Sequence, residues 1–131
     1  MLILGTTVIG ARDVGRATRF WTEALGLTAL PPVGDNGFTN LRQPDGRPVL
    51  AIQQSEHDAE PEPRLHLDLH ARDSTDQAAE IKRLVGLGAQ RVPWDRYPEE
   101  SDFVVLEDTE GNRFCVIDNS RAPEQCRLEM S

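Results

Sequence analysis

The sequence predicts an α+β fold built from two tandem β-α-β-β-β modules, and three observations support this prediction. The tripeptide Ala-Arg-Asp occurs at residues 11–13 and again at residues 71–73, sixty positions later. A glycine at the end of an apolar helical stripe recurs at the same interval, as Gly26 and Gly86. Each copy is followed by the same order of helical and extended patterns. Motif, interval and order together indicate an internal duplication, which decides the fold prediction.

The first module covers residues 1–54. Residues 2–9 are rich in β-branched side chains and predict a strand. Asp13 is a suitable N-cap for a helix whose apolar residues, Trp21 among them, share one face, and Gly26 ends that helix. Proline and glycine turns then separate three expected strands at residues 27–30, 37–42 and 48–54.

The second module, residues 64–119, opens on an alternating stretch. Between residues 64 and 70 the side chains predict a strand with an apolar face of Leu65, Leu67 and Leu69. The opposite face carries His66, Asp68 and His70. Two imidazoles beside a carboxylate indicate either a solvated outer face or the wall of a cavity.

A helix follows, with Asp73 or Ser74 as its cap, Ser74 and Gln77 as a capping box, and Gly86 as its end. Strands are expected at residues 90–92, 103–107 and 113–117, with a turn at residues 108–111. Acidic, proline-bearing residues 55–63 predict a linker between the modules. The polar tail, residues 120–131, is either disordered or packed on a partner. We therefore expect one domain over residues 1–131.

Composition excludes several classes of function. The net charge of −8 makes a nucleic-acid partner a poor expectation, because phosphates attract Lys and Arg. No run approaches the roughly 18 apolar residues of a membrane span, and the N-terminal residues lack the basic start of a signal peptide. Two cysteines are too few for a disulfide framework, which favours a cytoplasmic protein. Cys115 lies in an apolar run and is expected to be a buried thiol.

Three local patterns resemble the vicinal oxygen chelate superfamily, the glyoxalase, bleomycin-resistance and dioxygenase fold, and in particular its bacterial glyoxalase-like domain proteins. They are Arg19-Phe20-Trp21 with Leu25-Gly26-Leu27, Leu65-His66-Leu67-Asp68, and Asp108-Thr109-Glu110-Gly111-Asn112 followed by Phe114-Cys115-Val116. The resemblance covers about residues 2–118. It implies that the modules form a cup-shaped incomplete barrel with helices on the convex side, and that two chains pair as a homodimer.

The resemblance also implies four concave positions for the ligands of a catalytic metal. Carried onto this chain, they fall on Thr6, Ala51, His66 and Cys115. A hydroxyl, a methyl, an imidazole and a thiol do not supply three firm ligands. We therefore expect no metal and no other cofactor, with His66 and Cys115 as the weak candidates should a divalent metal bind. Asp68 lies two residues along the strand, from where its reach to such a metal is awkward.

Strand alternation then selects a cavity wall, and the loop at residues 93–102 adds two aromatic side chains that could close over it. The expected ligand contacts are Thr6, Val8, Gln53, His66, Asp68, Trp94, Tyr97 and Cys115. Such a wall suits a small, partly hydrophobic organic molecule. The first hypothesis is a metal-free binding protein of the sequestration or resistance type. The alternative is a lyase, isomerase or dioxygenase with His66 as general base or metal ligand and Asp68 as its orienting group.

Plainer interpretations of the same residues stay open. His70 and Asp68 could belong to a solvated rim, and His66 could simply bond Thr6 or water. Cys115 could be a small core hydrophobe. Trp21 is expected in the core, and His57 in the linker is expected on the surface.

Overall fold

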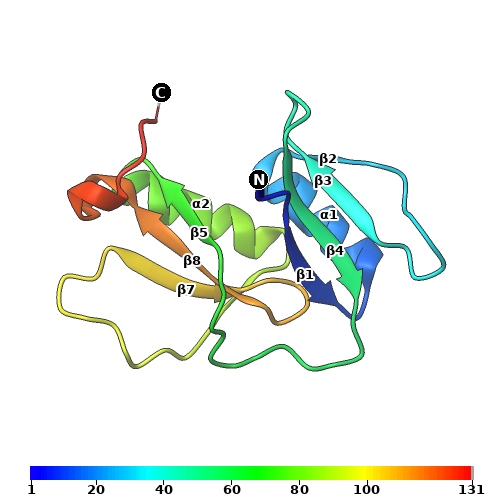
Figure 1. Ribbon diagram of the computed structural model, residues 1–131. Helices are drawn as coiled ribbons and strands as arrows, with labels where there is room; N and C mark the ends of the chain where they lie inside the picture. Colours follow the sequence, from blue (N-terminus) through cyan, green and yellow to red (C-terminus); the bar gives the residue numbers. More distant parts are fainter. Residues whose placement is uncertain (131) are drawn as a thin grey trace. The chain divides into compact units, whose positions relative to one another are not determined.

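The computed structural model describes residues 1–130. The chain divides into two compact units, residues 1–59 and the remainder from residue 60, so the division falls within the expected linker. Each unit holds one long helix and one four-stranded sheet, with the helix packed on one face of its own sheet (Figure 1). The tandem α+β prediction is thus confirmed. No helix in the described part of the chain is long and apolar enough to cross a membrane.

The first unit follows the predicted order of elements. They are β1 (Thr7–Ala11), α1 (Val14–Leu25), β2 (Thr28–Ala29), β3 (Thr39–Arg42) and β4 (Pro48–Gln54). The strands lie in the order β1-β4-β3-β2; β1 runs parallel to β4, and the other neighbours are antiparallel. The parallel pair brings together the first and last strands of the module, although they are far apart in sequence.

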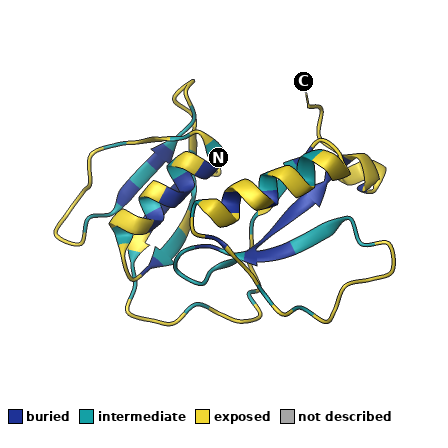
Figure 2. Ribbon diagram, turned by 180° about the vertical axis from the view of Figure 1, so that it is seen from behind, coloured by how far each residue is buried: buried dark blue, intermediate teal, exposed yellow. Residues whose placement is uncertain are grey.

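Helix α1 begins and ends where its sequence signals predict. The Asp13 side chain accepts a hydrogen bond from the Arg16 N–H at 2.9 Å, and Gly26 closes the helix in the left-handed conformation at φ 66°. Phe20 and Trp21 are 2 % and 1 % exposed, with their rings edge to face. The prediction that Trp21 is a core residue is confirmed. In Figure 2 the buried residues of α1 follow one side of the helix.

The first strand is shorter than predicted. β1 starts at Thr7 rather than residue 2, and the side chains of Met1 to Leu4 are at least four-fifths exposed. Its partner β4 begins at Pro48, which has no N–H for a sheet hydrogen bond. Residues before Thr7 therefore have no strand to pair with, whatever their β propensity.

The second unit repeats the first. Its elements are β5 (Asp68–Ala71), α2 (Ser74–Gly86), β6 (Gln90–Arg91), β7 (Phe103–Glu107) and β8 (Arg113–Asp118), followed by the short 3-10 helices η1 (Asn119–Arg121) and η2 (Glu124–Cys126). The strand order β5-β8-β7-β6, with β5 parallel to β8, matches that of the first unit. The hairpin turn forms as predicted, because the Asp108 carboxylate accepts from the N–H groups of Glu110 and Asn112.

The ends of α2 differ in detail from the prediction. Asp73, one of the two expected caps, accepts from the N–H of Asp76 at 2.9 Å. The capping box was wrong: the Gln77 side chain donates instead to the carbonyls of Asp102 and Val116. The helix ends at Gly86, as predicted, but Gly86 keeps helical geometry and the residue with positive φ is Gly88, at φ 120°.

The alternating strand of the second module is also shorter than predicted. β5 begins at Asp68, and Leu65 is 76 % exposed, so the expected apolar face loses its first member. Among the described residues, β5 is an edge strand whose one partner is β8. His66 therefore lies in the irregular segment just before the strand.

The polar tail packs on its own unit as far as the structure describes it. Ala122 is 1 % exposed, and Asn119 holds residue 128 by two hydrogen bonds, accepting from the Leu128 N–H and donating to its carbonyl. The segment thus has contacts within its own unit as far as residue 128.

Candidate functional site

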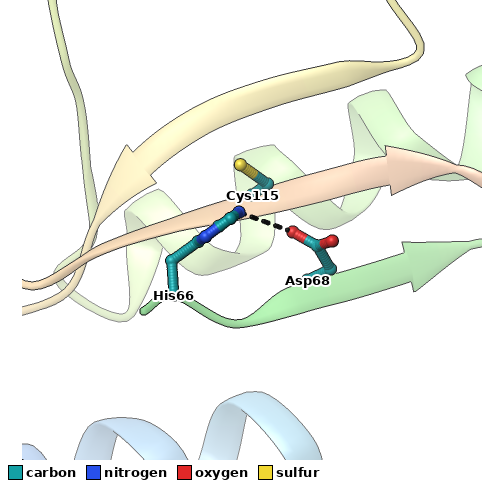
Figure 3. Close-up of side chains that lie close together, drawn as sticks. All are labelled: His66, Asp68 and Cys115. Atoms are coloured by element: carbon teal, nitrogen blue, oxygen red, sulfur yellow. Dashed lines mark ion pairs between the residues drawn. The ribbon is translucent and has the colours of Figure 1, made fainter. Parts of the chain in front are cut away.

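Three polar side chains converge where β5 meets β8. The strand register places Asp68 opposite Cys115, and the Cys115 N–H donates to the Leu67 carbonyl at 2.9 Å. His66 folds toward Asp68, with Nε2 of the imidazole 3.1 Å from Oδ1 of the carboxylate. One potential ligand atom from each of the three residues lies within 4.8 Å of the other two (Figure 3). Asp68 therefore lies within hydrogen-bonding distance of His66.

The contact with Asp68 determines which nitrogen of His66 carries a proton. A carboxylate only accepts hydrogen bonds, so Nε2 is the donor and a neutral ring keeps Nδ1 as its basic atom. The side chains of His66 and Asp68 are about half exposed, at 44 % and 51 %. An oriented imidazole with a free basic nitrogen can accept a proton from, or hydrogen-bond to, a bound molecule.

Cys115 is the buried member of the group, at 8 % exposure. Burial raises the pKa of its thiol from 9.0 to about 12, and the nearby negative charges of Asp68 and Asp102 add to this, as does a hydrogen bond to Asp68. The thiol is therefore protonated at neutral pH. The expectation of a buried thiol is confirmed, although the sulfur also faces a cavity.

The three groups are of the types that bind zinc or a similar transition metal. The structure thus supplies a third potential ligand, Asp68, that the four family positions did not contain. The fit is nevertheless partial. The thiol holds its proton, and both Nε2 of His66 and the thiol already hydrogen-bond to Asp68. A metal ion would have to displace both protons. The three side chains already satisfy one another as a hydrogen-bonded network.

A cavity of about 290 Å³ opens beside this group in the second unit. It is lined by Pro63, His66, Trp94, Phe103, Val105, Arg113, Phe114 and Cys115. Most of this wall is apolar. Trp94 packs with Phe103 against the buried cluster that contains Val105 and Cys115.

A second cavity, of about 250 Å³, has a more polar wall that includes Asp68, His70 and Asp102. His70 is half-buried rather than a solvated rim residue, with Nδ1 2.8 Å from Oδ1 of Asn119. That oxygen already accepts from the Leu128 N–H, which fixes the orientation of the amide. Nδ1 of His70 must therefore donate, and the tail residue Asn119 positions the ring.

The two aromatic residues expected to contact the ligand, Trp94 and Tyr97, differ in their positions. Tyr97 is not part of either cavity wall; its hydroxyl accepts from the Val105 N–H at 2.9 Å and its ring packs on Phe103. Trp94 does line the first cavity. His57 is exposed, as expected.

Three expected contact residues, Thr6, Val8 and Gln53, belong to the first unit. There Val8 lies opposite Ala51, so this pair occupies the register position that Asp68 and Cys115 hold in the second unit. The alignment of Ala51 with Cys115 is thereby confirmed. Because Val8 and Ala51 are apolar, the first unit has no counterpart of the Asp68–Cys115 contact.

Sequence reasoning missed Arg113, Phe103 and Asn119. A signal for Arg113 was present, because it precedes Cys115 by two residues on the same strand and so shares its face. Phe103 pairs with Ile117, which follows Cys115 by two residues on the same strand, and could have been found in the same way. Asn119 had no signal, since its role depends on the path of the tail.

Two small α+β units, each with its first and last long strands paired in parallel and its helix on one side of the sheet, define the class of paired-module proteins to which the solved neighbours belong. The family model described as "Glyoxalase-like domain" matches residues 6–117. The chain belongs to this glyoxalase-like family, within the vicinal oxygen chelate superfamily. The comparison with curated protein sequences gave no match.

Solved structures share the fold. A possible glyoxalase from Bacillus cereus is 19 % identical, with a TM-score of 0.66 over 89 % of this chain and 99 % of its own. A glyoxalase-related enzyme from Fulvimarina pelagi is also 19 % identical, with a TM-score of 0.66 over 100 % and 98 %. A mutant of the fosfomycin resistance protein FosX from Listeria monocytogenes, solved with Mn(II) and a dihydroxypropylphosphonic acid, is 14 % identical, with a TM-score of 0.71 over 98 % and 99 %. At these identities the likeness concerns the fold alone.

Proposed function

We propose that this protein binds a small, partly hydrophobic organic molecule in the cavity beside His66, without a catalytic metal, as a sequestering or resistance protein would. The observation that supports this most directly is an apolar cavity of about 290 Å³ with one oriented imidazole at its wall. That volume is near the lower end of the range for small-molecule sites. A FosX neighbour was solved with a phosphonic acid, and another is described by glyoxalase, bleomycin resistance and dioxygenase together, so ligands of this size suit the fold.

Binding can be measured through Trp94, which lines the cavity, whereas Trp21 is 1 % exposed and remote from solvent. A panel of small aromatic and aliphatic acids, amides and alcohols is titrated against tryptophan emission and checked by calorimetry. We expect saturable binding whose fluorescence signal disappears in Trp94→Phe. His66→Ala should weaken binding, and His57→Ala, which changes an exposed linker residue, is the matched control. Equal binding by both histidine variants would contradict the proposed site.

The metal-free part of the proposal has its own test. A divalent metal held by His66, Asp68 and Cys115 would polarise oxygen atoms of a bound ligand. We expect protein purified without added metal to contain well under one equivalent of Zn, Mn, Ni or Fe, because Cys115 retains its proton. Stoichiometric metal that is lost in His66→Ala but retained in His57→Ala would refute a metal-free site.

The contact between His66 and Asp68 favours a second candidate function, that of an enzyme. In it Nδ1 of His66 removes a proton from the bound molecule, and Asp68 stabilises the imidazolium that forms. Turnover of a bound compound that is lost in His66→Ala and reduced in Asp68→Asn would establish catalysis. Tight binding with no chemical change of any bound compound would contradict the enzyme and leave binding as the function.

A further inference from the structure

The wall of the 290 Å³ cavity carries positive charge in an acidic protein. The chain has 22 acidic and 14 basic residues, yet none of the residues that line this cavity is acidic. Arg113 supplies a guanidinium and His66 an imidazole. The neighbouring cavity is the opposite case, since Asp68 and Asp102 both line it. The two cavities share His66 but differ in their other charged side chains, which are an arginine in the first cavity and two aspartates in the second.

Arg113 has a charge that the described residues do not neutralise. It makes no ion pair among residues 1–130, even with Glu107, which lies opposite it in the strand register. Arg96 offers a contrast within the same unit, because it pairs with Glu62 at 2.8 Å. Both guanidiniums lie over the ring of Trp94, at 4.5 Å for Arg96 and 5.7 Å for Arg113. Arg113 is thus held by an aromatic face with its donors available.

A second unpartnered donor lies in the same wall. The indole Nε1 of Trp94 is buried and finds no hydrogen-bond acceptor in residues 1–130. An indole N–H and a guanidinium can only donate hydrogen bonds. A buried donor without an acceptor is costly, so an acceptor on a bound molecule would relieve that cost. Both groups therefore favour a ligand that brings negative oxygen atoms.

We infer that the molecule bound in this cavity is an organic oxyanion, an apolar or aromatic group carrying a carboxylate or phosphonate, with its charge held by Arg113 and an oxygen accepting from the Trp94 indole. The apolar part lies against Phe103 and Val105. This inference rests on the proposed binding function and specifies the chemical class of the ligand. A guanidinium suits either anion, since its planar donors match two oxygen atoms at once.

The test compares ligands that share one apolar group and differ in charge. Phenylacetate, phenylphosphonate and neutral phenylacetamide are titrated by calorimetry. We expect at least one anion to bind roughly fivefold or more tightly than the amide, since a hydrogen bond to a charged group is worth about 1 kcal/mol more than a neutral one. Preference for phenylphosphonate over phenylacetate, or the reverse, supports the inference and assigns the type of anion.

Variants then assign the charge to Arg113. Arg113→Gln should bring the anion-to-amide affinity ratio close to one, and Arg113→Lys should keep part of it. Arg91→Gln, which removes an exposed arginine outside the cavity wall, should leave the ratio unchanged. Equal affinity for anion and amide in the unmodified protein overturns the inference while leaving the proposed binding function intact. Retention of the ratio in Arg113→Gln overturns it as well, and failure of every probe to bind overturns both proposals.

Discussion

The ionisation of Cys115 gives the sharpest test of the site's electrostatics. Its thiol pKa is raised from 9.0 to about 12, first by burial and then by the charges of Asp68 and Asp102. A rise of about three pH units corresponds to roughly 4 kcal/mol between the two protonation states, as an order of magnitude. At pH 8 only about one molecule in ten thousand would carry the thiolate, against about one in ten for an ordinary thiol.

The measurement is made in a Cys126→Ser background, so that Cys115 is the single thiol in the sequence. Thiolate absorbance near 240 nm and the rate of iodoacetamide alkylation are followed against pH. We expect Asp68→Asn to lower the pKa of Cys115, and Asp102→Asn to lower it less, because Asp68 is the larger electrostatic cause and also bonds the thiol. Burial, the largest cause, remains in both variants, so the pKa should stay above 9.0.

The same ionisation predicts how stability depends on pH. The folded-state pKa lies above the unfolded one, so the native state keeps the proton that the unfolded state loses between pH 9 and about 12. The stabilising contribution is therefore complete below pH 9 and is lost as the pH rises through 12. Relative to Cys115→Ser, which does not titrate there, the free energy of unfolding should fall across that window. Ionisation of Cys115 near 9.0, or no change in Asp68→Asn, would refute the electrostatic reasoning.

Three further predictions concern stability, the first two measured by urea denaturation and the third by amide hydrogen exchange. Gly88→Ala should destabilise the protein by more than about 1 kcal/mol, because Gly88 has φ 120° and a new Cβ would lie 2.8 Å from a threonine methyl. Gly86→Ala, at a helical position with open space, should be neutral or stabilise the protein by up to about 1 kcal/mol. Equal effects of the two substitutions would contradict this reasoning. Asp13→Ala should cost about 1 kcal/mol through loss of the α1 cap, and an unchanged midpoint would show that the cap contributes nothing. Asn119→Ala should release the tail, so amide exchange at Leu128 should become faster with little change in the core. Unaltered exchange at Leu128 would show that the two hydrogen bonds from Asn119 do not hold the tail.

The order of elements could be predicted because the duplication repeats its signals. Asp13 and Gly26 each mark a helix end by a local mechanism, a side-chain cap and a left-handed residue, and both signals were read correctly. Gly86 does end α2, as the interval of sixty residues predicts, but two glycines lie close together there and the backbone uses Gly88 for the positive-φ position.

The strand lengths and the geometry of the site were harder to predict from the sequence, because they depend on partners remote in sequence. The β-branched and alternating residues before Thr7 and Asp68 predict extended chain, but only a paired neighbour turns extended chain into a strand. His66 was selected as a candidate from the sequence and lines the cavity, yet its contact with Asp68 could not be predicted from regular strand geometry, since His66 lies outside the strand.

The two units use one backbone register for different chemistry. Val8 opposite Ala51 and Asp68 opposite Cys115 occupy equivalent places, so the parallel pairing of these strands does not depend on which side chains fill this position. An apolar pair can neither hold a proton nor orient an imidazole, whereas the Asp68–Cys115 pair does both, keeping the thiol protonated and binding His66. The side chains at this position can therefore be apolar or polar without loss of the sheet. For that reason the chemistry that we propose depends on the residues of the second unit, and fold likeness to metal-bound neighbours does not decide it.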